Sequence, residues 1–263
     1  MQLSRGFSLV ELAVVIFIVG LLLGGAVLTL SAQEEQRANA ETRRRLEAAV
    51  DAVIGFALVN RRLPCPAIGA TGVESTGVGW TAADGGACGN NFSGFLPGRT
   101  VGFQPVDGQG FAVDAWGNRI RYGVASAVVS STCASGAPHF TSVSRLRGNG
   151  VGCQPNDLLI CRSAANIQPA AAPPACDPPP PPSPNAVTNQ QTVAFLVLSM
   201  GKNGRDPAPA QSADELANTN GDAIFISREH GTLQTTTGTF DDMLIWVPAG
   251  VLYARLLAGG LLP

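Results

Sequence analysis

The chain has 263 residues, enough for one large domain or two small ones with a buried core. Only 14% of the residues are charged, and 31 glycines and 19 prolines favour loops and short strands. The net charge of −2 leaves no basic surplus to displace counterions from a phosphate backbone, so nucleic acid is not expected as a partner. His139 and His230 lie far apart in the sequence, which disfavours a histidine-built metal or catalytic centre.

The N-terminal part of the chain is strongly apolar. Residues 12–33 carry no charge, and a helix of about 20 residues matches a hydrocarbon core about 30 Å thick. We therefore predict a single transmembrane segment at about residues 12–33. A cleaved secretory signal peptide is the alternative, but Glu11 would then lie in its apolar region, and Leu30 would occupy a position that needs a small residue.

A carboxylate beside this apolar run is costly near the membrane interior unless it has a partner. The run Gly6–Leu12, with the sequence GFSLVEL, resembles the processing motif of type IV pilins and type II secretion pseudopilins. The resemblance implies that a prepilin peptidase removes the leader 1–6 by cutting between Gly6 and Phe7, and then methylates Phe7 to N-methylphenylalanine. It also implies that Glu11 pairs with the Phe7 amine of a neighbouring subunit, which offsets part of the desolvation of both charges.

No helix breaker follows the apolar segment, and helix formers continue through residues 34–45. Apolar residues then recur at helical spacing and form a stripe suited to packing on a globular domain: Leu46, Val50, Val53 and Ala57. Pro64 sets the latest end, so we predict one helix over about residues 7–60. The side chains of Arg43, Arg44 and Arg45 are expected on a solvated face, with a membrane-surface or inter-subunit contact as the alternative.

Residues 61–263 are expected to form a β-rich periplasmic domain, because turn residues interrupt the chain every few positions. The predicted strands are Arg119–Val124, Ala194–Leu198, Ala223–Ser227 and Met243–Val247, and residues 251–257 are predicted to form a short C-terminal helix. The Pro-rich segment at about 169–184 favours polyproline II and an exposed loop or spacer, with ligand recognition as the alternative. The predicted fold class is α+β: a long N-terminal helix packed on an antiparallel sheet with disulfide-bearing loops, as in pilins.

Two later segments extend the resemblance. Asp114–Tyr122 is similar to the Asp-Pro-Trp-Gly-Asn…Tyr segment of the type II secretion major pseudopilin, although Ala115 replaces the usual proline. Its role is expected to be structural, with Gly117 in a tight turn and Trp116 anchoring that turn in the core. A ligand-binding role for Trp116 is the alternative. The run Phe240–Trp246 resembles the Asp-Asp-Ile-Val segment near the end of pseudopilins and many minor pilins.

All the cysteines lie after the apolar segment, at Cys65, Cys88, Cys133, Cys153, Cys161 and Cys176. An even number of cysteines in an exported domain predicts disulfides, and the absence of any Cys-x-x-Cys pair disfavours a zinc site. We expect Cys65 to pair with Cys88, and Cys161 to pair with Cys153 or Cys176.

Major pseudopilins bind Ca²⁺ near the C-terminus, so the resemblance makes a calcium site possible here. The candidate ligands are Asn203, Asp222, Asp241 and Asp242, with Asp206, Asn218 and Asn220 as further candidates. Asp and Asn beside Gly are also ordinary turn formers. Adjacent carboxylates on an extended segment are expected to point to opposite faces, which separates Asp241 from Asp242.

The sequence contains no nucleophile elbow, phosphate-binding loop or dinucleotide fingerprint, so we do not expect an enzyme. The leading hypothesis is a pilin-like structural subunit that is anchored once in the bacterial inner membrane, with its C-terminal domain in the periplasm. It would assemble as a minor component of a type IV pilus or a type II secretion pseudopilus. Its expected partners are prepilin peptidase, other pilin or pseudopilin subunits and inner-membrane lipids. A membrane-anchored adhesin or ligand-binding module that displays the Cys- and Pro-rich domain is the alternative.

Overall fold

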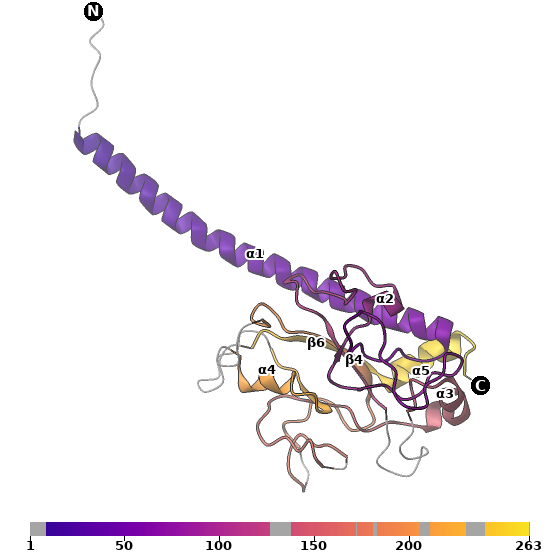
Figure 1. Cartoon of the computed structure of the whole chain (residues 1–263). Coiled ribbons are helices and arrows are strands. Elements are labelled where there is room, and N and C mark those ends of the chain that lie inside the picture. The colour runs from indigo at the N-terminus through magenta and orange to yellow at the C-terminus, as the bar shows by residue number, and fades with distance from the viewer. Residues whose placement is uncertain are drawn as a thin grey trace, which may run out of the picture. The chain divides into compact units, whose positions relative to one another are not determined.

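The computed structural model describes residues 9–126, 138–171, 173–180, 183–205, 211–229 and 240–262, and of residues 22–32 it describes the backbone alone. The chain divides into two compact units, Met1–Glu41 and Thr42–Pro263. Helix α1 (Leu9–Asn60) contains 52 residues and continues from the first unit into the second (Figure 1).

The part of α1 in the second unit buries one apolar face. Leu46, Ala49, Val53 and Ala57 are at most 1% exposed and belong to the main core, whereas Val50 is only partly buried at its edge. These spacings of three and four residues place the buried side chains on one side of the helix. The predicted stripe is therefore confirmed at Leu46, Val53 and Ala57, whereas Ala49 is fully buried and the predicted Val50 is only partly buried.

The main sheet is antiparallel, as predicted, and has the strand order β1-β2-β4-β6. Its strands are β1 (Gly94–Phe95), β2 (Arg121–Val124), β4 (Val193–Ser199) and β6 (Met243–Pro248). In the register, Tyr122 lies opposite Val197, and Val197 lies opposite Ile245 on its other side. Every residue of β4 is buried, because this strand lies between two others and contributes to the core that also contains α1 residues.

A second, smaller pair of strands departs from the purely antiparallel prediction. Strands β3 (Leu159–Cys161) and β5 (Ile224–Ile226) pair in parallel, with Ile160 opposite Phe225. Parallel strands need a long connection between them, and here that connection includes β4 and helix α4 (Ala213–Ala217). The pair has its own apolar cluster, which includes Leu159, Cys161, Cys176 and Phe240.

The remaining helices are short. Helix α5 (Ala249–Ala258) confirms the predicted C-terminal helix, and it buries Leu252 and Leu256. Sequence reasoning missed α2 (Gly98–Val101), α3 (Val143–Asn149), α4 and the 3₁₀ helix η1 (Gly150–Gly152). These missed elements contain seven residues at most, too few for a helical hydrophobic period to be recognised.

Two disulfides of the second unit are described with both of their cysteines. Cys65 is bonded to Cys88, in agreement with the expected pairing, and Cys161 is bonded to Cys176, one of the two partners considered. Cys153 is also disulfide-bonded, whereas Cys133 lies outside the described residues.

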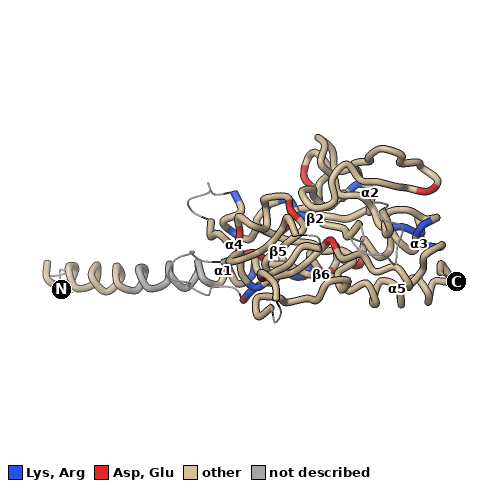
Figure 2. Tube along the Cα trace, turned by 90° about the horizontal axis from the view of Figure 1, so that it is seen from below, with Lys and Arg blue, Asp and Glu red and all other residues tan. Residues whose placement is uncertain are grey.

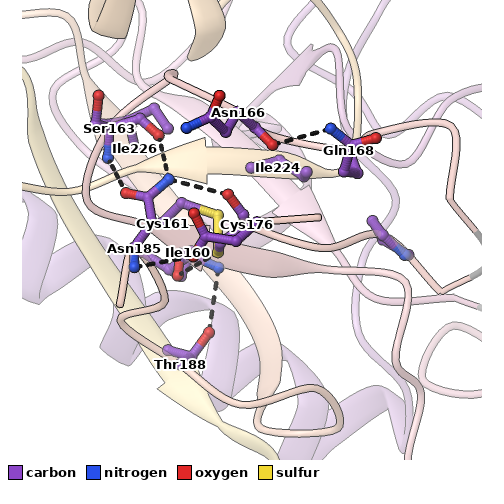
Figure 3. The surroundings of a disulfide bond; sticks show 12 residues. Ile160, Cys161, Ser163, Asn166, Gln168, Cys176, Asn185, Thr188, Ile224 and Ile226 are labelled. Carbon is purple, nitrogen blue, oxygen red and sulfur yellow. Dashed lines mark hydrogen bonds between the residues drawn. A yellow bond between two sulfur atoms is a disulfide. The ribbon is translucent and has the colours of Figure 1, made fainter. Parts of the chain in front are cut away.

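The Pro-rich segment is exposed at Pro178–Pro180, as predicted, but its base is fixed. The side-chain amide of Asn185 donates to the carbonyls of Ser163 and Cys176, at 2.9 and 3.0 Å (Figure 3). The Pro179–Pro180 peptide bond in this segment is cis.

Candidate functional site

The start of α1 carries an exposed apolar surface. Ten large apolar side chains within residues 9–21 are between 47% and 85% exposed, including Leu9, Ile16 and Phe17. They occupy all sides of the helix, a pattern that requires burial against lipid or other protein. Glu11 lies in the first turn, where a carboxylate interacts favourably with the positive end of the helix dipole.

The processing residues Gly6 and Phe7 lie outside the described residues. Among the residues that were described, no helix combines the length and the hydropathy that a membrane crossing requires.

Helix α1 is attached to the second unit by polar contacts as well as apolar ones. The Thr42 hydroxyl, fully buried, accepts a hydrogen bond from the backbone N–H of Ala115 at 3.2 Å. Arg45 donates to the carbonyl oxygen of Asp114 at 2.8 Å. The prediction of a solvated side chain is therefore wrong for Arg45, because the Asp114 turn packs against its face of the helix. Arg43 is exposed, as expected.

The Asp114 carboxylate organises that turn. Its Oδ1 accepts from the backbone N–H groups of Trp116 and Asn118, at 2.9 and 2.8 Å, and its Oδ2 accepts from the Ser199 hydroxyl at 2.5 Å. Burial raises the pKa of Asp114, and these hydrogen bonds oppose that rise. Gly117 has a φ of +78°, which glycine adopts without strain. Trp116 is only half-buried, so the anchor of this turn is Asp114 and not the predicted Trp116.

Three carboxylates converge at the start of β6. Oxygen atoms of Glu215, Asp241 and Asp242 all lie within 4.8 Å of one another. The prediction that Asp241 and Asp242 diverge is wrong, because both residues precede β6 and the alternation of strand side chains does not apply to them. Glu215 and Asp242 are buried, at 2% and 5% exposure.

Local hydrogen bonds hold this carboxylate cluster, which we define as Glu215, Asp241 and Asp242. Glu215 forms a capping box with Ser212 at the start of α4, and its Oε1 accepts from the backbone N–H of Asp241 at 3.0 Å. The Asn218 amide donates to Asp242 at 2.7 Å. Sequence reasoning missed Glu215, although the spacing from Ser212 to Glu215 is a recognisable capping signal.

Burial and mutual repulsion disfavour the charged forms of the two aspartates in the carboxylate cluster. Burial raises the pKa of Asp241 to about 6, and the nearby Glu215 charge makes a smaller contribution to this rise. Burial also raises the pKa of Asp242, with added repulsion from Glu215 and Asp241. Within the described part of the chain, Oδ1 of Asp241 and Oδ1 of Asn203 are buried without a hydrogen-bond partner.

This donor set has the chemistry that Ca²⁺ prefers, namely carboxylate oxygens with an adjacent amide oxygen. Asn203 belongs to the group, since its side-chain amide donates to Glu215 at 3.1 Å. Asp222 is placed apart, in a turn where it accepts from Asn220 and from the backbone N–H of Ile224. Of the predicted ligands, Asn203, Asp241 and Asp242 are therefore brought together, Asp222 is a turn former, and Asp206 lies outside the described residues.

Comparison with known proteins adds one finding at the N-terminus. Residues 1–27 match the prokaryotic N-terminal methylation motif, which is the signature of type IV pilins and pseudopilins. No curated protein matches the chain, and no solved structure matches it. The match therefore bears on the start of α1 and on the residues before it.

Proposed function

Starting from this signature, we propose that the chain is a pilin-like structural subunit without enzymatic activity. The methylation motif supports a type IV pilin-like substrate of prepilin peptidase. In our proposal the peptidase cleaves between Gly6 and Phe7 and methylates Phe7. The exposed start of α1 then anchors the protein in the inner membrane and later packs among the helices of other subunits in a filament.

The observation that carries this proposal is the apolar surface of residues 9–21. Burying one large apolar side chain contributes roughly 1.5–3 kcal/mol. Ten such side chains are exposed here, so their burial would contribute on the order of 15–30 kcal/mol in total. A surface of this size favours association with lipid or with helices of like character over exposure to water.

The disulfides support a periplasmic location for the second unit, because such bonds persist in oxidising compartments. The long loops around them support a minor component and not the repeating major subunit. A type IV pilus and a type II secretion pseudopilus both fit, and a gene neighbourhood with a secretion ATPase and secretin, or with pilus retraction genes, would distinguish these two machines.

Processing is tested by expressing the full chain with a prepilin peptidase and analysing its N-terminus by mass spectrometry. We expect loss of residues 1–6 and one methyl group on Phe7. Gly6→Ala should block both changes. Gly20→Ala is the matched control, since a Cβ there meets nothing within 4 Å, and it should be processed normally. Normal maturation of Gly6→Ala would refute the cleavage site.

Assembly is tested separately with Glu11→Gln. This variant should be processed but should fail to enter filaments, because it removes the charge that pairs with a neighbouring Phe7 amine. Glu34→Gln, which neutralises an exposed carboxylate further along the same helix, should assemble. Normal incorporation of Glu11→Gln would exclude the proposed ion pair while leaving the processing result intact.

A further inference from the structure

A cleft of about 510 Å³ lies beside the Pro-rich segment in the second unit, within the usual size range of ligand pockets. Leu159, smaller apolar residues and uncharged polar side chains line it. The polar ones are Asn156, Ser183, Thr188, Asn189, Gln190 and Gln191. This cleft is distinct from the carboxylate cluster and from the apolar start of α1.

The wall of the cleft is fixed by covalent and hydrogen bonds. Cys176, which lines it, is bonded to Cys161 in β3. The Thr188 hydroxyl oxygen accepts from the backbone N–H of Ile160 at 3.1 Å, and Figure 3 shows this contact below the disulfide. The Gln190 amide donates across to the carbonyl of Pro174 at 3.3 Å. A preformed wall reduces the ordering cost of binding.

Several polar side chains at the cleft have no hydrogen-bond partner among the described residues. In the described part of the structure, no hydrogen bond involves the side chains of Ser183, Asn189 or Gln191, and all three residues are exposed. Each primary amide offers donors and acceptors at once. The cleft thus presents two amides and one hydroxyl that remain available to a ligand.

The lining also restricts the chemistry of that ligand. No charged side chain is present among the described lining residues, so a charged ligand would find no counter-charge. The described lining has no aromatic ring to stack on a sugar. A peptide backbone presents one N–H and one C=O in each unit, and a primary amide can pair with both. The small apolar residues of the lining suit small side chains.

We propose that this cleft binds an extended, uncharged peptide segment of another protein. Asn189 and Gln191 pair with the backbone of that segment, and the small apolar residues contact its side chains. The proposal is independent of filament incorporation, because the cleft belongs to the second unit and uses no residue of the N-terminal motif.

The test uses the full chain in detergent with isotope-labelled Asn and Gln side chains, titrated with the capped peptide acetyl-Ala-Ser-Thr-Ala-amide and followed by NMR. We expect the amide signals of Asn189 and Gln191 to move. Asn189→Ala and Gln191→Ala should each raise the dissociation constant roughly five-fold, the effect of one lost neutral hydrogen bond. Gln36→Ala, which removes an exposed amide from α1, should leave it unchanged.

Three results would overturn the proposal. The first is that the peptide moves no signal of the cleft. The second is that both cleft variants bind as tightly as the parent protein while their spectra show an intact fold. The third is that a methyl glycoside, titrated in parallel, moves the Asn189 and Gln191 signals when the peptide does not, which would assign the cleft to a saccharide.

Discussion

The ion pair between Arg62 and Glu74 provides a quantitative test of how the end of α1 is held. The two guanidinium nitrogens Nη1 and Nη2 donate to Glu74 Oε2 and Oε1 at 2.8 and 2.7 Å. Both side chains are nearly buried, at 7% and 10% exposure. The guanidinium also lies over the rings of Phe56 and Trp80, at 5.3 and 5.4 Å from their centroids.

Glu74→Gln keeps the shape of the side chain but removes its charge. The Arg62 guanidinium is then left buried without a counter-charge, and Cys65 loses a charged acceptor for its backbone N–H, now at 3.0 Å. Breaking one side of a buried pair typically costs about 3–5 kcal/mol. We therefore expect the free energy of unfolding to fall by about that amount in chemical denaturation of the full chain in detergent.

The double variant Arg62→Met with Glu74→Leu separates the cost of an unpaired charge from the net value of the pair. Replacing a buried pair with apolar residues of similar volume is often neutral or stabilising, so we expect this variant to be more stable than Glu74→Gln. The exposed pair of Arg43 and Glu47 is the control, and Glu47→Gln should change stability by about 0–1 kcal/mol. A loss in Glu74→Gln no larger than in this control would refute the reasoning.

Two further predictions concern pH and metal ions. Burial lowers the pKa of His139 from 6.5 to about 4, so the imidazole binds a proton more readily in the unfolded chain than in the folded one. The free energy of unfolding should therefore fall by about 3 kcal/mol as the pH drops from above 6.5 to below about 4. His139→Gln should flatten this slope in melts at graded pH; an unchanged slope would contradict it. Burial raises the pKa of Asp241 to about 6, so the folded chain holds this proton more tightly than the unfolded chain. The stability that Asp241 contributes is therefore present at low pH and is lost as the pH rises from about 4 to above 6. Ca²⁺ at a hundred times its dissociation constant should add about 2.7 kcal/mol to the free energy of unfolding at neutral pH. Asp241→Asn should abolish this gain, and Asp222→Asn should retain it. A thermal melt that neither calcium nor a chelator changes would exclude the site.

The elements that could be predicted are those with a local signal. The helical spacing of Leu46, Val53 and Ala57 identifies the buried face of α1 without knowledge of what covers it. The apolar run at the start of β4 identifies a strand, because a short continuous apolar run is typical of a strand buried on both faces, and β4 is buried throughout. The predicted start of β2 is two residues early, since Arg119 still belongs to the turn organised by Asp114 and bridges Val113.

The candidate site could be predicted only in part, because its members are brought together by contacts between distant residues. Glu215 lies 26 positions from Asp241, and their hydrogen bond depends on how α4 packs beside the start of β6. The cap at Ser212 could have indicated a helix start, but nothing local indicates which carboxylates that helix would meet. Similarly, Arg45 resembles its exposed neighbour Arg43 in sequence, and the difference arises from the position of the Asp114 turn.

The contacts of α1 in the second unit divide into two kinds with different physical roles. Burial of Leu46, Val53 and Ala57 is non-directional and stabilises the association without fixing the rotation of the helix. Directional bonds then lie on either side of this apolar stripe: Arg45 with the Asp114 carbonyl before it, and Arg62 with Glu74 after it. Two separated polar contacts specify both the rotation and the axial position of a helix.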